Sequence, residues 1–288
     1  MDLAKGAALA QGIDLPTPIP GAIGTAHPAT LPSMYDLPSE DPEEPGLPDE
    51  FHDLQPHLLS ATLRLTGYAQ GEIFTGTDMN VYYDVRHPLW HKRPDWFLVC
   101  GVSRLYDQTD LRLSYVVWQE RVSPMVIVEL LSPGTEDEDM GRTEAKAAAP
   151  PTKWQVYEQI LQVPYYILFD RYTDTLTAFV LTDGRYQPVA TPDQRVWMER
   201  LNAGIGLWHG TYDGITRLWL RWYDADGQWL PTPAEAAQQE AELARQQAEL
   251  ARQQLETEQQ RANQAIADLE RLRQQLRDRG IDPDGLGS

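Results

Sequence analysis

The sequence predicts a mixed α/β domain with one central β-sheet, followed by a long helix. Short runs rich in β-branched and aromatic residues follow one another between residues 72 and 132, as consecutive strands do. A segment with helical spacing, 152–163, then separates two apolar runs, 125–132 and 163–170. A helix between two apolar strands is typical of a crossover connection within a sheet. From residue 234 the composition changes to Ala, Glu, Gln, Arg and Leu, which indicates an exposed helix.

Length and charge limit the possible classes of protein. With 288 residues and 42% hydrophobic content, the chain is long enough for one sizeable core with appendages. The formal net charge of −19 argues against a broad basic surface that binds nucleic acid unspecifically. The acids are concentrated, however: residues 1–50 carry nine acids and one lysine, whereas residues 51–233 carry 23 acids and 16 bases. The net charge therefore does not exclude a local cationic groove in the middle of the chain.

Targeting signals and cysteine content indicate the compartment. No stretch approaches the roughly 20 apolar residues of a membrane span, and the first residues lack the basic start and apolar centre of a secretion signal. The sequence has one cysteine, Cys100, in the apolar run "WFLVCGV". This excludes a disulfide framework and favours a small buried hydrophobe over a nucleophile. We therefore expect a cytoplasmic protein with no membrane partner.

The N-terminal region combines an irregular arm with a helix. Residues 1–48 are rich in Pro and acids and show no periodicity, so we expect a largely disordered arm. The following segment "DEFHDLQPHLLSATLRLTG" places its leucines largely on one face. Asp49 or Asp53 can cap this helix and Gly67 can end it. Pro56 fits best within a first turn, which favours a start near Asp53.

We expect the core to occupy residues 49–190 and its sheet to be mixed. The predicted strands comprise 72–76, 80–85, 95–102, 125–132 and 163–170, and a hairpin at 176–190 turns at Asp183-Gly184. Residues 191–233 hold much of the tryptophan and contain two further Asp-Gly turns. They predict a β-rich extension that packs its aromatic rings against the sheet, with an aromatic ligand platform as the alternative.

The C-terminal segment, residues 234–280, predicts a long helix or coiled coil before a flexible end at 281–288. It contains the tandem repeat "AELARQQAELARQQ", and an apolar seam with heptad spacing continues beyond it. Leu243 and Leu250 fall off this seam, whereas Glu258 falls on it. A solvated single helix is therefore the alternative, and we expect self-association through residues 241–279.

Three residues on adjoining elements carry the chemistry. Asp95 stands where one apolar strand begins, Glu129 lies inside the next, and Lys153 opens the helix that follows. If the strands are neighbours and the helix crosses over them, the three side chains converge. Two carboxylates then bind a hard divalent cation, Mg²⁺ or Mn²⁺, and the lysine acts on a water or a phosphate. The structural alternative is a strand-end glutamate paired with Lys153 alone.

The order of these motifs resembles a known family. Pro94-Asp95, "VELLSPGT" from Val128, Lys153 with Tyr157 four residues on, and "VPYYILFD" from Val163 are similar to the Uma-type restriction endonucleases. That family belongs to the PD-(D/E)XK nuclease superfamily. The resemblance covers roughly residues 51–190 and leaves the flanking tails outside it.

The resemblance implies a restriction endonuclease-like core that hydrolyses DNA phosphodiester bonds with a metal ion. In it, Asp95 and Glu129 hold the metal, and a lysine sits beside the scissile phosphate. Leu131 replaces the usual lysine two residues after the glutamate, so Lys153 is the matching residue, with Lys146 as a competitor. The alternative function is a non-catalytic adaptor that keeps the nuclease fold and assembles through its C-terminal helix.

Other residues are secondary candidates. Asp84 is a further possible carboxylate near the metal, although a turn-capping acid is the simpler interpretation. Ser132 can hold the loop backbone, Tyr157 can hydrogen-bond within the site or pack, and His57 can face the site or the solvent. The acidic run 136–139 is expected to be a solvated loop.

Overall fold

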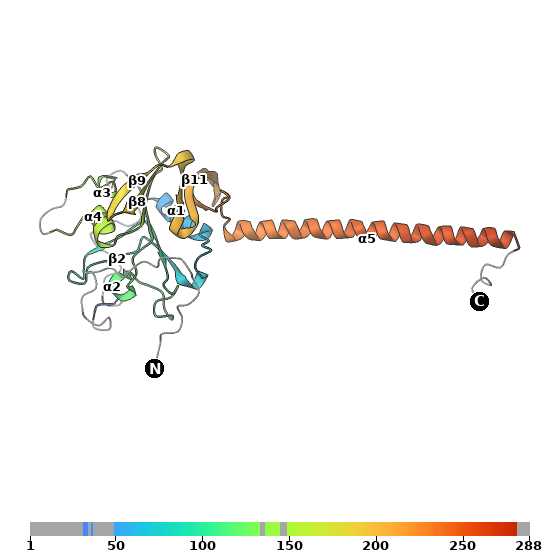
Figure 1. The fold of residues 1–288 in the computed structure, drawn as a ribbon, viewed down its shortest axis with the longest axis horizontal. Coiled ribbons are helices and arrows are strands. Elements are labelled where there is room, and N and C mark those ends of the chain that lie inside the picture. The colour runs from blue at the N-terminus through green and yellow to red at the C-terminus, as the bar shows by residue number, and fades with distance from the viewer. Residues whose placement is uncertain (1–30, 34–35, 37–48, 133–135, 145–148, 281–288) are drawn as a thin grey trace. The chain divides into compact units, whose positions relative to one another are not determined.

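A computed structural model describes residues 31–33, 36, 49–132, 136–144 and 149–280. The chain divides into two compact units, Met1–Leu230 and Pro231–Ser288 (Figure 1). The arm predicted for residues 1–48 lies almost wholly outside the described residues. Of its described part, the carbonyl groups of Leu31 and Pro32 accept hydrogen bonds from Gln119 Nε2, at 3.1 and 3.3 Å, and Pro32 also accepts one from Trp118 Nε1 at 2.9 Å.

The first unit is built on a six-stranded mixed sheet, which confirms the predicted fold class. Its strand order is β1-β4-β6-β7-β8-β9, and all neighbours are antiparallel except the β6–β7 pair, which is parallel. The predicted hairpin is present, and Asp183 and Gly184 form its turn with positive φ angles of 50° and 73°. The strands are β1 (Ile73–Thr77), β4 (Trp96–Cys100), β6 (Val126–Leu130), β7 (Tyr165–Asp170), β8 (Thr175–Thr182) and β9 (Arg185–Val189).

Two three-stranded sheets accompany the main sheet. The tryptophan-rich extension forms the meander β10 (Arg195–Met198), β11 (Ala203–Tyr212) and β12 (Ile215–Tyr223). The second small sheet has the order β3-β2-β5, so the run 80–85 is not a strand of the main sheet as the sequence suggested. Within the run 80–85 only Val81 and Tyr82 pair with neighbouring strands, and both of those strands are two residues long. These strands are β2 (Val81–Tyr82), β3 (His91–Lys92) and β5 (Tyr115–Val116), and α2 (Val117–Glu120) follows directly.

The first helix, α1 (Glu50–Thr62), begins earlier than predicted and ends well before Gly67. Asp49 is its N-cap, since its carboxylate accepts hydrogen bonds from the backbone N–H groups of Phe51 and His52. Pro56 therefore lies inside the helix and removes one backbone hydrogen bond. Its burial in the core, together with the Asp49 cap, offsets that loss.

The core has two layers, one on each face of the main sheet. Alternate residues of β4 and β6, such as Trp96, Leu98 and Val128, face α1 and the β10–β12 meander. Phe97 and Ile127 point to the other face, where the chain between β6 and β7 packs. Trp219 and Trp222 are fully buried in the first layer, as expected for aromatic residues that pack against the sheet.

The connection from β6 to β7 is the predicted crossover, but it is not one regular helix. It contains α3 (Glu136–Asp139), α4 (Lys153–Gln155) and the π-helical turn η3 (Val156–Ile160). Thr152 and Gln155 cap α4 reciprocally through a capping box. The backbone N–H of Leu161 donates to the carbonyl of Val156, five residues earlier, which is the hydrogen bond that defines the π turn.

Glu158 fastens this π turn to the edge strand β9. Its carboxylate is buried and accepts hydrogen bonds from the Tyr186 backbone N–H at 3.0 Å and from Arg185 Nη1 at 2.9 Å. Burial by itself raises the pKa of Glu158, but these bonds and one from Gln159 outweigh it and hold the pKa below the usual 4.5. The carboxylate form of Glu158 therefore stabilises the folded state.

We expect Glu158→Gln to lower the free energy of unfolding by about 1–3 kcal/mol at pH 7. Because the folded pKa lies below the unfolded one, this stabilisation is present above the unfolded value and is lost as the pH falls through the folded value. Urea unfolding of both proteins at pH 7 and at successively lower pH measures the difference. A difference that stays constant across this range would contradict the assigned role.

The second unit contains α5 (Pro233–Asp278), a helix of 46 residues that confirms the predicted long C-terminal helix. Thr232 and Glu235 form a capping box at its start, with Pro233 in the first helical position. None of its residues is buried within the chain. Among the described residues, no helix combines the length and apolar character needed to cross a membrane.

Candidate active site

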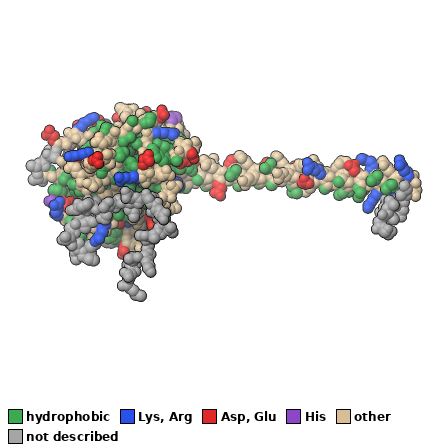
Figure 2. Space-filling model, viewed as in Figure 1, with side chains coloured by type: hydrophobic (Ala, Val, Ile, Leu, Met, Phe, Trp, Pro, Cys, Tyr) green, Lys and Arg blue, Asp and Glu red, His purple; other side chains and the backbone are tan. Residues whose placement is uncertain are grey.

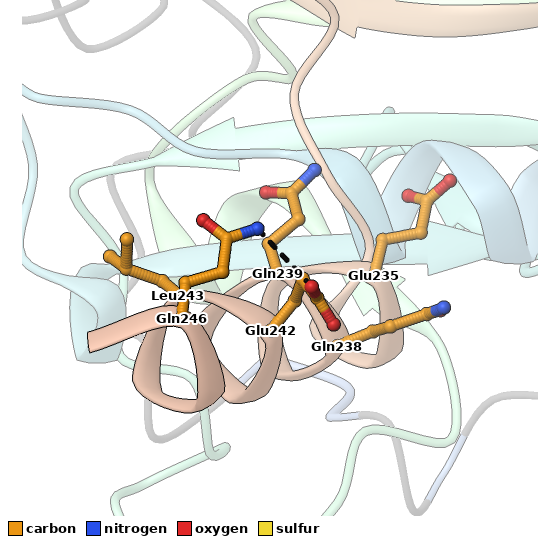
Figure 3. Close-up of a pocket in the computed structure, with 6 residues that line it drawn as sticks. All are labelled: Glu235, Gln238, Gln239, Glu242, Leu243 and Gln246. Carbon is orange, nitrogen blue, oxygen red and sulfur yellow. Dashed lines mark hydrogen bonds between the residues drawn. The ribbon is translucent and has the colours of Figure 1, made fainter. Parts of the chain in front are cut away.

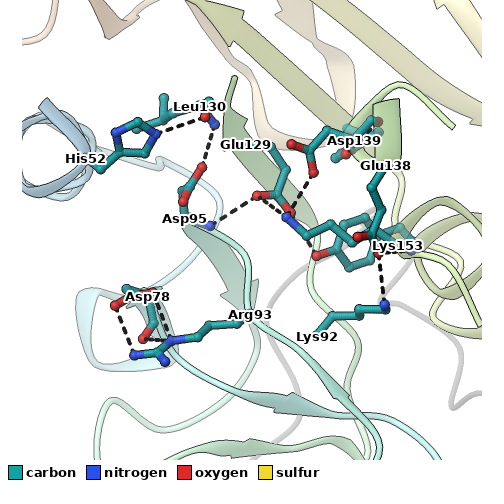
Figure 4. A network of polar contacts seen from close by, with 12 residues as sticks. His52, Asp78, Lys92, Arg93, Asp95, Glu129, Leu130, Glu138, Asp139 and Lys153 are labelled. Carbon is teal, nitrogen blue, oxygen red and sulfur yellow. Dashed lines mark hydrogen bonds and ion pairs between the residues drawn. The ribbon is translucent and has the colours of Figure 1, made fainter. Parts of the chain in front are cut away.

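Strand register brings Asp95 and Glu129 to the same end of the sheet. Trp96 of β4 pairs with Val128 of β6, so Asp95 lies next to Glu129 on the neighbouring strand. Glu129 is one position away from side chains of the first core layer and therefore points toward the crossover, whereas the Asp95 carboxylate, just ahead of β4, is directed at the Leu130 backbone. The Asp95 backbone N–H donates to Glu129 Oε2 at 3.4 Å, and Asp95 Oδ2 accepts from the Leu130 N–H at 2.6 Å (Figure 4).

Lys153 completes the cluster from the opposite side. As the first residue of α4 it projects back toward the sheet, and its Nζ lies 3.2 Å from Glu129 Oε2 (Figure 4). Tyr157, four residues later, donates from its hydroxyl to Glu129 Oε1 at 2.8 Å. The Glu129 side chain is only 1% exposed, whereas that of Lys153 is 16% exposed, so Lys153 lies closer to solvent. The structure thus brings Asp95, Glu129 and Lys153 together.

The segment α3 supplies a third carboxylate that the sequence interpretation missed. Asp139 Oδ1 lies 2.8 Å from Lys153 Nζ, and Asp139 is buried. Glu138 Oε1 accepts hydrogen bonds from the Lys153 backbone N–H at 3.2 Å and from Lys92 Nζ at 3.1 Å (Figure 4). The expectation of a solvated loop at 136–139 is therefore wrong for its second half. Within a run of four acids, nothing in the sequence distinguishes the member that turns inward.

Two further contacts hold α3 against the site. Tyr166 on β7 donates from its hydroxyl to the Asp139 carbonyl at 2.9 Å. Gly141 has φ +70° and lies so close to Trp154 that a Cβ atom there would be 2.6 Å from the indole. Only glycine meets both conditions, because other residues are strained at this φ and have a Cβ to accommodate.

His52 on α1 supports the site from the other face of the sheet. Its Nε2 lies 3.0 Å from the carbonyl oxygen of Leu130, and its Nδ1 lies 2.9 Å from Asp49 Oδ1. Leu130 connects this pair to the site, since its N–H donates to Asp95. The sequence did contain a signal, because His52 shares the helix face of Gln55 and Leu59, both buried.

The secondary candidates lie in different places. His57 is exposed and lies 3.7 Å from Asp53, on the outer face of α1. Asp84 accepts hydrogen bonds from Arg86 and His87 in its own loop, which matches the simpler interpretation of a turn-capping acid. Ser132 is half-buried just after β6. Lys146 lies outside the described residues.

Burial and neighbouring charges shift the pKa values of the clustered groups in opposite directions. Burial raises the pKa values of Asp95 and Glu129, although the nearby Lys153 ammonium partly counteracts this. Burial alone would lower the pKa of Lys153, but Glu129, Asp139 and Asp95 outweigh it and raise that pKa. When all four groups are ionised, three carboxylates face one ammonium, which leaves two negative charges uncompensated.

The donor set fits a hard divalent cation. Mg²⁺ in proteins is commonly held by one or two carboxylates and completes its shell with water and substrate phosphate oxygens. Asp95, just ahead of β4, and Glu129 on β6 stand opposite each other and offer two such carboxylates, and one Asp95 oxygen already accepts from the Leu130 N–H. Among the described residues, no group of three or more His, Cys, Asp or Glu side chains is arranged to hold a metal ion. A cation at this place would therefore rely on two protein carboxylates and on water or phosphate.

A family model and a solved structure match this chain. Residues 30–209 match the family model Uma2, described as "putative restriction endonuclease". A solved structure, "a putative nuclease belonging to DUF820 from Anabaena variabilis ATCC 29413", matches with 11% identity and a TM-score of 0.38. The match covers 54% of this chain and 76% of that one. No curated protein matches the sequence.

Proposed function

The chain belongs to the Uma2 family, described as "putative restriction endonuclease", and on this premise we propose that it cleaves DNA by metal-dependent hydrolysis at Asp95, Glu129 and Lys153. The observation that carries the proposal is the contact between Lys153 Nζ and the buried Glu129 carboxylate at 3.2 Å. Asp95 lies directly beside that carboxylate. All three residues fall within the part of the chain that matches the family.

The charge of the cluster supports a cation-binding role. A buried carboxylate is costly unless an opposite charge compensates it. Lys153 supplies one positive charge to three carboxylates, so a divalent cation would balance the remaining two. Asp95 and Glu129 would hold this ion, and the bound ion would stabilise charge on the phosphate and lower the pKa of a bound water.

Lys153 acts in this proposal as a cation and not as a base. The surrounding carboxylates raise its pKa, so its side chain is an ammonium group at neutral pH. An ammonium group beside the scissile phosphate stabilises the negative charge that develops during hydrolysis. Asp139 and Glu129 each lie within ion-pair distance of Nζ and fix its direction, while the Tyr157 hydroxyl orients Glu129.

The position of Lys153 also accounts for the residue that replaces the superfamily lysine. Leu131, two residues after Glu129, is buried in the layer beneath the crossover. Lys153 on α4 contacts the Glu129 carboxylate instead, so the site keeps a positively charged side chain although β6 does not supply one. The competing adaptor function would fit a Lys153 that points to solvent, whereas this side chain is 16% exposed and turned inward.

Nicking of supercoiled plasmid tests the proposal. We expect the purified protein to convert supercoiled DNA to open-circular or linear forms with Mg²⁺ or Mn²⁺, and to leave it intact in EDTA. A parallel assay with single-stranded DNA and with RNA defines the strandedness and type of substrate. If none of these nucleic acids is cleaved with either metal ion, the proposed function is wrong.

We expect His52 to act as a positioning residue for this site. His52→Ala removes the contact with the Leu130 carbonyl, so Leu130, whose own N–H donates to Asp95, loses one of its two polar contacts near the site. Outer-shell partners of metal ligands typically affect metal affinity or activity by about 10–100-fold, and we expect a loss of that size in both. His52→Gln keeps a donor for the carbonyl and should recover part of it. If His52→Ala changes only thermal stability, the residue is purely structural.

A further inference from the structure

Helix α5 carries a row of apolar residues from Ala241 to Leu276 that Glu258 interrupts. It lies outside the residues that match the family, so what it does is independent of the nuclease proposal. Figure 2 shows hydrophobic side chains recurring along α5 between charged ones. The exposed fractions of Leu255, Leu269 and Leu272 are 59%, 51% and 54%, although leucine is normally a core residue.

This row has the spacing of a coiled-coil seam. Its positions alternate by three and four residues over five heptads, a repeat that indicates pairing with another helix. Leu243 and Leu250 are equally exposed, at 56% and 57%, but lie off the row. Leu243 lies among polar side chains on the first turns of the helix (Figure 3). The seam comprises Ala241, Ala244, Ala248, Ala251, Leu255, Glu258, Ala262, Ala265, Leu269, Leu272 and Leu276.

Side-chain size along the seam is unevenly distributed. From Ala241 to Ala251 every seam residue is alanine, whereas from Leu269 to Leu276 every one is leucine. In a parallel pair each seam residue meets its own copy. The helices would then approach closely at the alanines and be held apart at the leucines, because side-chain size sets the distance between helix axes. Glu258 would also face the partner's Glu258 within the seam.

An antiparallel pair removes both conflicts. With the two-fold axis near Gln260, Leu255 packs against the partner's Ala265, and Leu269 against the partner's Ala251. Leu272 and Leu276 meet the partner's Ala248 and the partner's Ala244, and Glu258 meets the partner's Ala262. Every layer then combines one alanine with one larger residue, which keeps the distance between the axes uniform.

The charges that flank the seam favour the parallel arrangement, but this preference is weaker than that of the seam packing for the antiparallel one. That arrangement would place Glu240 near the partner's Arg245 and Asp268 near the partner's Arg273. The antiparallel one brings Arg245 near the partner's Arg273 and Arg261 near the partner's Arg261. These positions are at the rim, where ion pairs and repulsions are screened by water and contribute little. Like charges and poor packing within the seam weigh more, because the seam is the part that loses contact with water.

We propose that α5 binds α5 of a second copy of this chain as an antiparallel coiled coil. The two copies then enter the paired helices from opposite ends. With a rise of 1.5 Å per residue, the two Pro233 positions lie about 80 Å apart along the axis. The two starts of α5, where each first unit joins its helix, therefore lie far apart along the pair.

Sedimentation velocity of the full-length protein tests the association. We expect a dimer for the wild type and a monomer for the double variant Leu269→Glu/Leu272→Glu. The matched control, Leu243→Glu/Leu250→Glu, changes two leucines of equal exposure off the seam and should remain a dimer. Circular dichroism checks that helix content is equal in all three proteins. A monomeric wild type, or a control that dissociates as completely as the seam variant, would overturn the proposal.

Disulfide cross-linking tests the orientation. The native Cys100 is buried, so cysteines introduced on α5 form the accessible pair. We expect a mixture of Ala251→Cys and Leu269→Cys proteins to form mixed disulfide dimers under mild oxidation. Ala251→Cys alone should not cross-link. Ready self-cross-linking of Ala251→Cys, without the mixed product, would show a parallel pair and contradict the antiparallel assignment.

Discussion

Glu129→Gln is expected to lower the rate of plasmid nicking by at least about a hundredfold while the protein stays folded. The substitution keeps the size of the side chain and removes the negative charge that Asp95 and Lys153 surround. An amide can still accept from Lys153 Nζ and hydrogen-bond with the Tyr157 hydroxyl, so packing is retained. A neutral amide oxygen is a much weaker ligand for a hard cation than a carboxylate. The nicking rate under saturating Mg²⁺ measures the effect.

Glu158→Gln is the matched control for this variant. Glu158 is also a buried glutamate of the first unit, but its carboxylate is bound by β9 residues and not by Lys153. We expect this variant to lose stability and to nick DNA at nearly the wild-type rate below its unfolding transition. If both glutamine variants lose activity in proportion to their loss of stability, Glu129 has no special role in the reaction.

Lys153→Met is expected to separate metal binding from turnover. Nicking should fall by about a hundredfold or more, because the ammonium that stabilises charge on the phosphate is lost. Metal affinity should be unchanged or higher, since Lys153 no longer competes with the cation for Glu129. Glu129→Gln should instead lose both properties. Nicking assays and metal titrations on the same samples measure this contrast.

Lys92→Met is the control for the loss of a lysine. Its side chain is 15% exposed, close to the 16% of Lys153, and it pairs with Glu138, which also accepts from the Lys153 backbone N–H. We expect a small effect on nicking, because Lys92 contacts neither Asp95 nor Glu129 in the described structure. Wild-type activity in Lys153→Met would contradict the assigned role. Lys146→Met would then be the next variant to assay.

Much of the fold could be predicted because its signals are local. The apolar runs of β4, β6 and β7, the Asp183-Gly184 turn and the helical composition after residue 234 each specify one element. The errors arose where distant partners decide the structure. Asp49 caps α1 and pairs with Arg171, so the helix starts at Glu50 and not near Asp53, and Pro56 lies beyond the first turn. The strand β2 joins a separate small sheet because it pairs with the nearby β3 and with β5, more than 30 residues further along the chain.

The site residues also divide into those that local sequence patterns predict and those that depend on distant contacts. The meeting of Asp95, Glu129 and Lys153 follows from side-chain alternation on two neighbouring strands and from a crossover helix. Asp139 could not be singled out, because its inward direction depends on Tyr166, Gly141 and Lys153, which lie on three other segments. His52 was obscured by the predicted helix start, which placed it outside the helix and left its buried face unnoticed.

Calorimetric titration of Mn²⁺ into the metal-free wild type and into Glu129→Gln tests the central claim most directly. The account places a divalent cation between Asp95 and Glu129, where three carboxylates face one ammonium. It predicts a saturable binding heat at about one ion per chain in the wild type and none in the variant. Absence of binding to the wild type, or equal binding to both proteins, would contradict the account.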